Sequence, residues 1–544
     1  MLRLNEVKLP LDHPETALAD AILARLHISA EQLLGYTVFK RSYDARKRSA
    51  IVLIYSLDVS LEDEAAVLVR IKHDMHVMPT PDTGYHFVAG GERAAGHDHN
   101  ERPVVIGTGP CGLFAALILA QMGLRPIILE RGKQVRERTV DTFGFWRKRA
   151  LNPESNVQFG EGGAGTFSDG KLYSQIKDPK HYGRKVLTEF VKAGAPDEIM
   201  YVSKPHIGTF RLVKMVEQMR ANIEQMGGEY RFESKVVDLE IEAGPDGGQL
   251  RGLTLASGEQ IATRHVVLAI GHSARDTFEM LHRRGVYIEA KPFSIGFRVE
   301  HPQSLIDDCR FGPNAGNPIL GAADYKLVHH AANGRSVYSF CMCPGGTVVA
   351  AASEPGRLVT NGMSQYSRNE RNANSAIVVG ISPLDYPGHA LAGIALQREL
   401  EERAFALGGS NYNAPGQLIG DFVAGRASTA FGSVTPSYQP GVQLTDLADA
   451  LPEYAISAMR EAFPAFNKQI RSYYQADAVL TGVETRTSSP IRIKRRDDNL
   501  QSLNTRGLFP AGEGAGYAGG ILSAGVDGIK VAEAVALSML ADCR

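Results

Sequence analysis

A glycine-rich loop is the clearest candidate for chemistry in this chain of 544 residues. The loop, GTGPCG at 107–112, follows the apolar run 104–106 and precedes an uncharged helical stretch. In such a loop Gly107 permits a tight turn, Gly109 lets a pyrophosphate approach the backbone, and Gly112 lets the helix pack on the strand. The helix N-terminus offers partial positive charge to phosphates. The predicted dinucleotide contacts here are Gly107, Gly109, Pro110, Cys111 and Gly112.

An acidic residue at the end of the next strand supports this site. Glu130 follows the loop by roughly 20 residues, where a carboxylate can accept hydrogen bonds from a ribose. Arg131 and Gly132 follow it, and a ligand-free turn does not explain that combination. Cys111 is expected to be a small packing residue.

Two cysteines form a second candidate for chemistry. Cys341 and Cys343 precede a Pro-Gly-Gly turn and have three interpretations: buried thiols, a redox-active pair or single nucleophile, or metal ligands. No Cys/His set with suitable spacing accompanies them, so we predict no metal site. A disulfide between residues this close would be strained and easily reduced. The sequence assigns no catalytic residue.

Several charged residues leave alternatives open. Lys291, Arg298, Glu300 and His301 lie on a strand-like stretch, where alternation places Lys291 and Arg298 on opposite faces, or they are ordinary surface charges. The polar residues 486–490 and the basic residues 492–496 line a pocket for an anionic substrate or for the cofactor, or they form a solvated loop and strand edge. The remaining candidates, acid–base groups or structural histidines, are His206 and His272.

The elements that must position these residues follow from periodicity and turn signals. The loop belongs to a β–α–β unit with strands at 104–106 and 126–130 and a helix at 111–122. Residues 89–102 are typical of a linker. Other predicted strands are 2–11, 38–43, 49–59, 229–241, 265–270 and 508–511, with a hairpin at 249–255 and 260–262; predicted helices are 17–26, 30–34, 62–71, one within 204–227, and 523–540; residues 291–500 are richer in short strands and turns.

Composition limits the classes of partner. Lys plus Arg is 59 and Asp plus Glu is 60, so the chain has no overall field for nucleic acid or an anionic membrane. The basic cluster at 41–48 is a solvated hairpin or a docking surface for an anionic partner. The uncharged stretch 103–124 contains a Gly/Pro turn, which favours a buried strand–turn–helix over a membrane span. Five cysteines and no signal peptide indicate a cytoplasmic setting.

Four separated segments resemble the glutathione-reductase-type FAD superfamily: 107–138, 160–171, 266–273 and 508–521. In that superfamily a strand ends in Gly-Asp and the Asp binds the ribityl chain; the pair here is Gly512-Glu513, whose acid is one methylene longer. A helix from Ile521 would point its N-terminus at the flavin. The further contacts that the resemblance implies are Glu130, Arg131, Arg138, Gly163, Gly165, Thr166, Val236, Gly271 and Gly520.

Five phrases resemble a bacterial group described as uncharacterised NAD(FAD)-utilizing dehydrogenases: 163–172, 291–302, 340–346, 368–379 and 512–528. The resemblance implies a FAD-dependent oxidoreductase. No second glycine loop with strand and helix flanks is found, so NAD(P)H is expected only as a transient electron donor. The implied fold class is α/β: a small α/β N-terminal module (1–95), a discontinuous Rossmann FAD domain (101–175, 229–290 and 503–544), and an inserted α+β substrate or cap domain (176–228 and 291–502).

The expected function is therefore the passage of hydride or electron pairs through flavin N5 to an unidentified small molecule. One alternative is a tRNA-modifying flavoprotein, supported only by the basic clusters at 41–48 and 492–496. The other is a non-catalytic flavin-based redox sensor that uses Cys341 and Cys343. Nucleic acid is not favoured as a partner, and the oligomeric state is not predicted.

Overall fold

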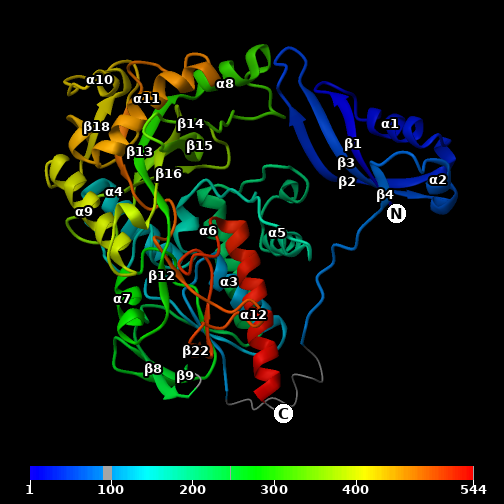
Figure 1. Ribbon diagram of the computed structural model, residues 1–544. Coiled ribbons are helices and arrows are strands. Elements are labelled where there is room, and N and C mark those ends of the chain that lie inside the picture. Colours follow the sequence, from blue (N-terminus) through cyan, green and yellow to red (C-terminus); the bar gives the residue numbers. More distant parts are fainter. Residues whose placement is uncertain (90–100, 246, 543–544) are drawn as a thin grey trace.

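The computed structural model describes residues 1–89, 101–245 and 247–542. Most of the predicted linker, 89–102, lies outside the described residues. Within them the strands form three main sheets and two smaller ones, and helices pack around these sheets to give a mixed α/β chain (Figure 1).

The N-terminal module is a four-stranded antiparallel sheet with two helices, in the order β2-β3-β1-β4. It projects from one side of the molecule in Figure 1. The predicted helix at 30–34 is wrong: a single turn ends at Gln32, and β2 begins at Leu33, which pairs with Leu61. So short a helix is unstable alone, and strand pairing prevails. Its elements are β1 (Leu2–Pro10), α1 (Ala17–Leu26), β2 (Leu33–Asp44), β3 (Val52–Leu61), α2 (Glu64–Arg70) and β4 (Val77–Pro79).

A five-stranded parallel sheet, in the order β23-β11-β5-β6-β7, carries the glycine loop. Its side chains alternate between the two faces of the sheet. Val105 and Val267 pack against helices, while Val104 and Val266 pack on the opposite face against a second four-stranded sheet, called the small sheet below, whose strands are at 236–244, 247–255, 260–262 and 505–506. The strands of the parallel sheet are β5 (Val104–Ile106), β6 (Ile127–Leu129), β7 (Glu229–Arg231), β11 (Val266–Leu268) and β23 (Leu508–Pro510); the covering helices are α3 (Pro110–Gln121), α6 (Thr209–Gln225) and α12 (Ile521–Asp542).

The predicted single strand at 229–241 is in fact two strands in different sheets. After β7 the chain turns at 232–235, where the amides of Glu233 and Ser234 donate to the carbonyl oxygens of Gly132 and Glu130. It then continues as β8 in the small sheet. The smaller elements are β8 (Val236–Gly244), β9 (Gly247–Leu255), β10 (Gln260–Ala262), β12 (Ile288–Ala290), β21 (Ile491–Ile493), β22 (Thr505–Arg506), α4 (Val135–Lys148), α5 (Tyr182–Lys192), α7 (Arg275–Arg283) and α8 (Gln303–Phe311).

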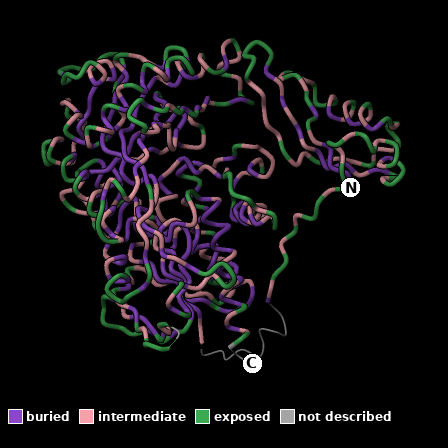
Figure 2. Tube along the Cα trace, viewed as in Figure 1, coloured by how far each residue is buried: buried purple, intermediate pink, exposed green. Residues whose placement is uncertain are grey.

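The region 291–500, expected to hold short strands and turns, builds an eight-stranded sheet that contains both short strands and three strands of ten residues or more, at 293–302, 336–350 and 372–381. Buried residues run almost without a break along β13 and β17, because helices and loops cover both faces (Figure 2). Alternation therefore gives no clear strand signal here. The elements are β13 (Phe293–Pro302), β14 (Val328–His330), β15 (Ser336–Ala350), β16 (Thr360–Ser364), β17 (Asn372–Ile381), β18 (Ala414–Leu418), β19 (Val442–Leu444), β20 (Val479–Glu484), α9 (Ala392–Leu407), α10 (Ile419–Ala424) and α11 (Glu453–Gln469).

Strand β13 places three polar side chains in the interior. Arg298, Glu300 and His301 are all buried, so interpreting them as ordinary surface charge is wrong. Ser437 and Asn372 donate hydrogen bonds to the Glu300 carboxyl group, and the His301 imidazole lies 2.8 Å from the carbonyl oxygen of Tyr473. Such partners are what allow polar groups to remain inside a sheet.

His301 should make stability depend on pH. Burial lowers the pKa of His301 to about 4, whereas an unfolded histidine titrates at about 6.5. Between these values the unfolded chain binds the extra proton, so this contribution to stability falls as the pH drops through that window. We expect His301→Gln, which keeps a donor toward Tyr473, to unfold in urea with a shallower pH dependence between about pH 7 and pH 5. Equal slopes for variant and wild type would contradict this assignment.

The N-terminal module docks on the main body through the cluster at 41–48. The Arg41 amide donates to the carbonyl oxygen of Tyr201 at 2.7 Å, and Asn314 donates to the carbonyl oxygen of Arg48 at 2.8 Å. Part of the cluster is thus an intramolecular contact.

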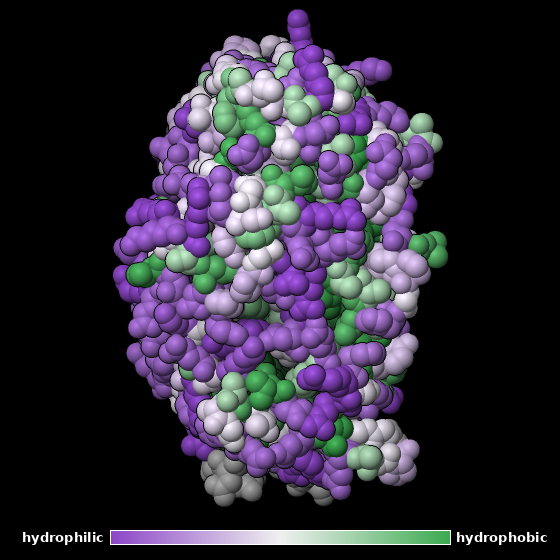
Figure 3. Space-filling view, turned by 90° about the vertical axis from the view of Figure 1, so that its left-hand side faces the viewer, coloured by the Kyte–Doolittle hydropathy of each residue, from purple (hydrophilic) through white to green (hydrophobic). Residues whose placement is uncertain are grey.

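On the face seen in Figure 3, hydrophobic residues form scattered small areas among hydrophilic ones. No helix of the described residues is long and apolar enough to cross a bilayer.

Candidate functional site

One cavity of about 920 Å³ lies between the parallel sheet and the eight-stranded sheet. This volume falls in the range of roughly 300–1,000 Å³ that is common for small-molecule and cofactor sites. The four sequence segments that resemble FAD-binding motifs all reach it. The predicted residues that line it are Gly107, Gly109, Pro110, Cys111, Glu130, Arg131, Gly163, Gly165, Val236, Gly271, Gly512, Glu513, Gly520 and Ile521. Three predicted residues do not line it: Gly112, Arg138 and Thr166.

The loop at 107–112 requires its glycines for steric reasons. Gly107 has a φ of +97°, and a Cβ there would lie 2.4 Å from the carbonyl oxygen of Ala269. A Cβ on Gly112 would lie 1.9 Å from the carbonyl oxygen of Gly107, so Gly112 packs the helix on the strand. Gly109 caps α3, and a Cβ on it would have only the Cα of Gly163 within 4 Å, at 3.8 Å. The loop therefore leaves an open cradle at the helix N-terminus.

Glu130 braces this loop as well as lining the cavity. Its carboxylate accepts hydrogen bonds from the Thr108 amide (3.1 Å) and hydroxyl (2.5 Å), and from the amides of Gly132 (2.9 Å) and Gly160 (3.0 Å). A carboxylate has about four acceptor positions. A ribose hydroxyl would therefore share a position that the protein already uses. Sequence reasoning identified Glu130 but missed the bracing by Thr108.

Two residues that were predicted to contact the cofactor instead bond the backbone of the neighbouring glycine segment from outside the cavity. Arg138 is fully buried, and its guanidinium donates to the carbonyl oxygens of Asn156, Val157, Gly160 and Glu161. The buried Thr166 hydroxyl lies 3.5 Å from the carbonyl oxygen of Glu161. These groups hold the segment that carries Gly163 and Gly165 into the cavity.

Arg131 lines the cavity with a guanidinium that is already engaged. It lies 2.7 Å from Glu154, 2.9 Å from Asp276 and 4.1 Å from the ring centroid of Phe159. Arg131 thus ties the end of β6 to α7. In the structure Arg131 therefore holds together the part of the cavity wall that these residues form.

The C-terminal glycine loop is held by a residue that sequence reasoning missed. The Gly512 amide donates to Asp527 on α12 at 2.8 Å, and Asp527 lies 2.6 Å from Arg495. An acid in the apolar stretch 521–542 was the available signal. The Cys111 side chain fills the space beside Gly512: a Cβ added to Gly512 would lie 2.8 Å from the Cβ of Cys111. Burial raises the pKa of the Cys111 thiol well above its usual range, which makes it an unreactive packing group, as expected.

A histidine beside Glu513 gives independent evidence of a ligand. His272 lines the cavity, and its Nδ1 lies 3.2 Å from the Glu513 carboxylate. Its Nε2 is buried and has no hydrogen-bond partner among the described residues. Buried polar atoms in native proteins nearly always have a partner, so a bound group is expected to supply one. His206, by contrast, bonds the carbonyl oxygen of Tyr366 and does not line this cavity.

The polar and basic residues at 486–496 divide between two roles. Arg486 lines the cavity and is buried. Arg495 is buried in its ion pair with Asp527, and the Arg492 guanidinium lies over the ring of Tyr517. Lys291 does not line the cavity; burial lowers its pKa. Of this run, only Arg486 and Thr487 line the cavity, so the interpretation as a wall of a substrate or cofactor pocket applies to its first part alone.

The far end of the cavity contains a set of reactive groups from the eight-stranded sheet. Cys341 on β15 and Glu484 on β20 line it together with Lys171, which continues from the glycine segment at 163–165. Burial raises the pKa of Glu484 to about 7, although Arg298 at 3.1 Å acts to lower it. A carboxyl group with such a pKa can hold or release a proton near neutral pH. Among the described residues no His, Cys, Asp and Glu cluster could hold a metal ion.

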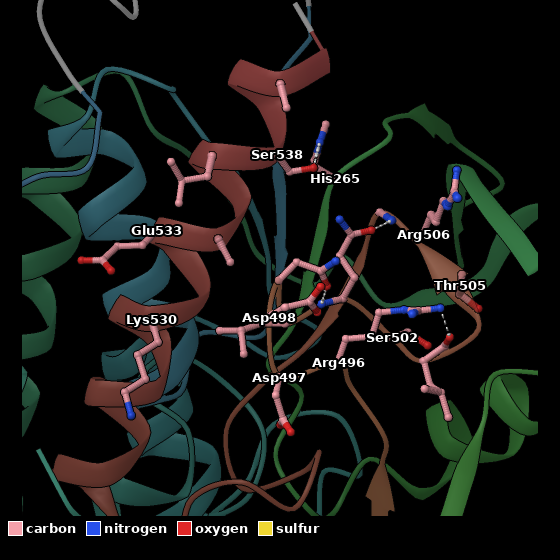
Figure 4. A pocket seen from close by; sticks show the side chains of 18 of the residues that line it. His265, Arg496, Asp497, Asp498, Ser502, Thr505, Arg506, Lys530, Glu533 and Ser538 are labelled. Carbon is pink, nitrogen blue, oxygen red and sulfur yellow. Dashed lines mark hydrogen bonds between the residues drawn. The ribbon is translucent and has the colours of Figure 1, made fainter. Parts of the chain in front are cut away.

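A larger cavity, of about 1200 Å³, lies beside the C-terminal half of α12 (Figure 4). The chain at 496–507 forms its opposite wall, and His265 lies 3.2 Å from Ser538 across one end. None of the nucleotide-motif glycines reaches it. Size alone does not make it the functional site, because the glycine cradle, His272 and Cys341 all face the smaller cavity.

Two family models match parts of this chain. The family described as FAD-dependent protein, C-terminal domain-like matches residues 292–487, and a domain of unknown function (DUF8436) matches residues 1–60. An uncharacterized protein of Clostridium beijerinckii is 48% identical over 534 residues, which cover 98% of each chain.

Solved structures give a weaker likeness. The halogenase PltM is 11% identical, with 81% of this chain and 70% of that chain covered and a TM-score of 0.38. A flavoprotein/dehydrogenase from Cytophaga hutchinsonii is 12% identical, with 80% and 78% covered and a TM-score of 0.35. The family assignment rests on the sequence matches: this chain belongs to the same family as the Clostridium protein, and its residues 292–487 match the model of the FAD-dependent protein, C-terminal domain-like family.

Proposed function

We propose that this chain binds FAD without a covalent bond and acts as an oxidoreductase on a small molecule. The observation that carries the proposal is the single cavity in which the glycine cradle of α3 and the C-terminal glycine loop meet Cys341 and Glu484. The cavity is thus shared by a nucleotide-type cradle and by groups that can carry out redox and proton chemistry. The FAD-dependent family match at 292–487 supports the same cofactor.

The residues present fit FAD. The cradle at Gly109 and the N-terminus of α3 suit the pyrophosphate, and the backbone near Val236 suits the adenine. Ile521 begins α12 directly after Gly520, and the N-terminus of this helix suits the flavin edge that becomes negative on reduction. Bound FAD would supply two-electron chemistry at N5. We propose a glutathione-reductase-type FAD domain at 101–175, 229–290 and 503–544, with a substrate domain at 176–228 and 291–502.

Groups of the eight-stranded sheet would handle the substrate. Glu484 holds a proton near neutral pH, while Lys171 supplies a positive charge in the same cavity. Because Arg298 lies against Glu484 and is fully buried, it orients this carboxyl group. We propose a cytoplasmic small-molecule substrate that gains or loses a hydride together with a proton.

The tRNA-modifying alternative has lost part of its support. Arg41 and Arg48 contribute backbone contacts between the module and the body, and Arg495 is buried in an ion pair. A guanidinium buried in an ion pair, such as that of Arg495, contributes little to the salt-dependent binding of a phosphate backbone, whereas the side chains of Arg46, Lys47 and Arg48 remain exposed.

The test is the visible spectrum of the purified protein, followed anaerobically with NADH and with NADPH. We expect a yellow protein whose denaturation releases FAD, and rapid bleaching by a nucleotide that binds only transiently. The same preparation should show no RNA binding at low salt. A folded, colourless protein that does not take up added FAD would contradict the proposal.

A further inference from the structure

We propose that Cys341 and Cys343 form a redox-active thiol pair that exchanges two electrons with the cofactor held in the same cavity. This inference rests on the proposed function and extends it by identifying an electron carrier in the chain. The pair lies on β15, and the cofactor-binding loops lie on the parallel sheet. The cavity joins the two: its wall includes Cys341, Glu484 and the glycine loops.

The local backbone brings the two thiols together. Along β15, Phe340 pairs with Ala376 and Cys343 pairs with Asn374, so β15 has one extra residue in this interval and forms a β-bulge. Cys341 has a φ of +45°, in the left-handed region that residues other than glycine seldom adopt. Backbone strain of this kind clusters at functional sites. The Cys343 sulfur lies 3.4 Å from the carbonyl oxygen of Cys341, and the two side chains interact directly.

The surroundings favour a thiolate on Cys341. The Arg298 guanidinium donates to the carbonyl oxygen of Cys341 at 2.7 Å and lies 3.9 Å from the Cys343 sulfur. The hydrogen bond from Cys343 lowers the pKa of Cys341, as do the charges of Lys171 and Arg298, and the pKa of Cys343 is raised in return. Cys341 is partly exposed and Cys343 is buried. Cys341 thus has the features of an attacking or leaving sulfur, and Cys343 those of its protonated partner.

The fold leaves room for this arrangement at a specific glycine. A Cβ on Gly362 of β16 would lie 2.4 Å from an Arg298 nitrogen and 2.4 Å from the Asn374 amide oxygen. Asn374 in turn accepts from the Arg298 Nε at 3.0 Å. Gly362 therefore gives the buried guanidinium the space from which it reaches Cys341.

The electron balance is that of a two-electron couple. On reduction, the Cys341–Cys343 disulfide accepts two electrons and one proton: the S–S bond breaks, the Cys341 sulfur becomes the thiolate, and the Cys343 sulfur becomes the thiol. Bound anionic reduced FAD (FADH⁻) would supply both electrons and the proton, and would itself become oxidised FAD. The reverse transfer forms the disulfide and reduces FAD. Because a disulfide between residues this close is strained, it is readily reduced, as an exchanging pair requires.

The experiment counts electrons and thiols in the FAD-loaded protein. Each sample is oxidised with ferricyanide, desalted, and titrated anaerobically with dithionite while FAD reduction is followed. We expect the wild type to consume about twice as many electrons per FAD as Cys341→Ser or Cys343→Ser. The matched control is Cys309→Ser, which should behave like the wild type. The Cys309 sulfur lies outside the cavity and donates to the carbonyl oxygen of Arg471.

A second readout does not depend on electron transfer. Iodoacetamide labelling with mass spectrometry should find Cys341 and Cys343 protected after oxidation and Cys341 labelled rapidly after reduction, with Cys309 labelled in both states. Equal electron uptake by wild type and Cys341→Ser, both carrying FAD, would overturn the thiol pair alone, as would equal labelling before and after reduction. A protein without FAD would instead overturn the proposed function and the inference with it.

Discussion

Replacing Gly109 with valine is expected to give a folded protein that no longer retains FAD. A Cβ at this position has almost no protein atoms around it, because the space beyond it is the cavity at the N-terminus of α3. The two Cγ atoms of valine would occupy the place proposed for the pyrophosphate. If the clash with the bound pyrophosphate costs as much as overpacking does in a protein core, it weakens binding by about 1–3 kcal/mol. Loss of the phosphate contacts adds to this, so we expect FAD affinity to fall by at least ~100-fold.

The measurement is the FAD content of purified Gly109→Val, together with a titration of added FAD. Gly144→Val is the matched control, since a Cβ on Gly144 meets nothing within 4 Å and the residue lies on α4 away from the cavity. It should keep the wild-type FAD content. A folded Gly109→Val protein with full FAD would show that the cradle at 107–112 does not hold the pyrophosphate.

Replacing Glu401 with glutamine is expected to cause a large loss of stability. Glu401 is fully buried on α9 and accepts hydrogen bonds from Arg275 at 2.7 Å, Arg486 at 2.8 Å and the Thr485 hydroxyl at 2.8 Å. Burial raises the pKa of Glu401, but the two guanidinium groups outweigh it and hold the pKa well below its usual range. Removing one partner from a buried charged network costs about 3–5 kcal/mol.

Urea unfolding followed by the fluorescence of Trp146 measures this loss, because the chain has a single tryptophan, which is buried on α4 and donates from its indole to the carbonyl oxygen of Ala350 on β15. The neighbouring Glu402 is exposed, so Glu402→Gln should change stability by no more than about 0.5 kcal/mol. The stability that ionised Glu401 contributes is fully present above the pKa of about 4.5 that the group has in the unfolded chain, and it is lost as the pH falls below that value. The difference in free energy of unfolding between Glu401→Gln and Glu402→Gln should therefore narrow in acid. Equal stability of the two variants at neutral pH would contradict the role of the network.

The glycine loop was predictable because its requirements are local. A positive φ at Gly107, a helix packed against Gly112 and an uncharged helix after it depend on residues close in sequence. The same holds for β5, α3 and β6, whose predicted ends differ from the structure by only a residue or so. The prediction of one strand at 229–241 failed because a turn bonded to Gly132 divides it, and Gly132 is distant in sequence.

The sequence pattern did not separate residues that face the cavity from residues that brace its loops. Arg138 and Glu130 belong to the same motif, yet Arg138 is wholly occupied by backbone carbonyl groups while Glu130 does both tasks. A motif records which residue types the loop needs. It does not record the direction of each side chain, which packing decides.

The sequence alone therefore determined a dinucleotide-type loop, its helix and the residues of the glycine segments. Only the tertiary structure decided that Cys341, Arg298 and Glu484 belong to one site. Arg298 and Glu484 meet because β13 pairs with β20, and Cys341 joins them because β17 lies between β13 and β15. Strand order in a sheet is set by burial and hydrogen bonding across long separations in sequence, and these leave no periodic trace around any one of the three residues.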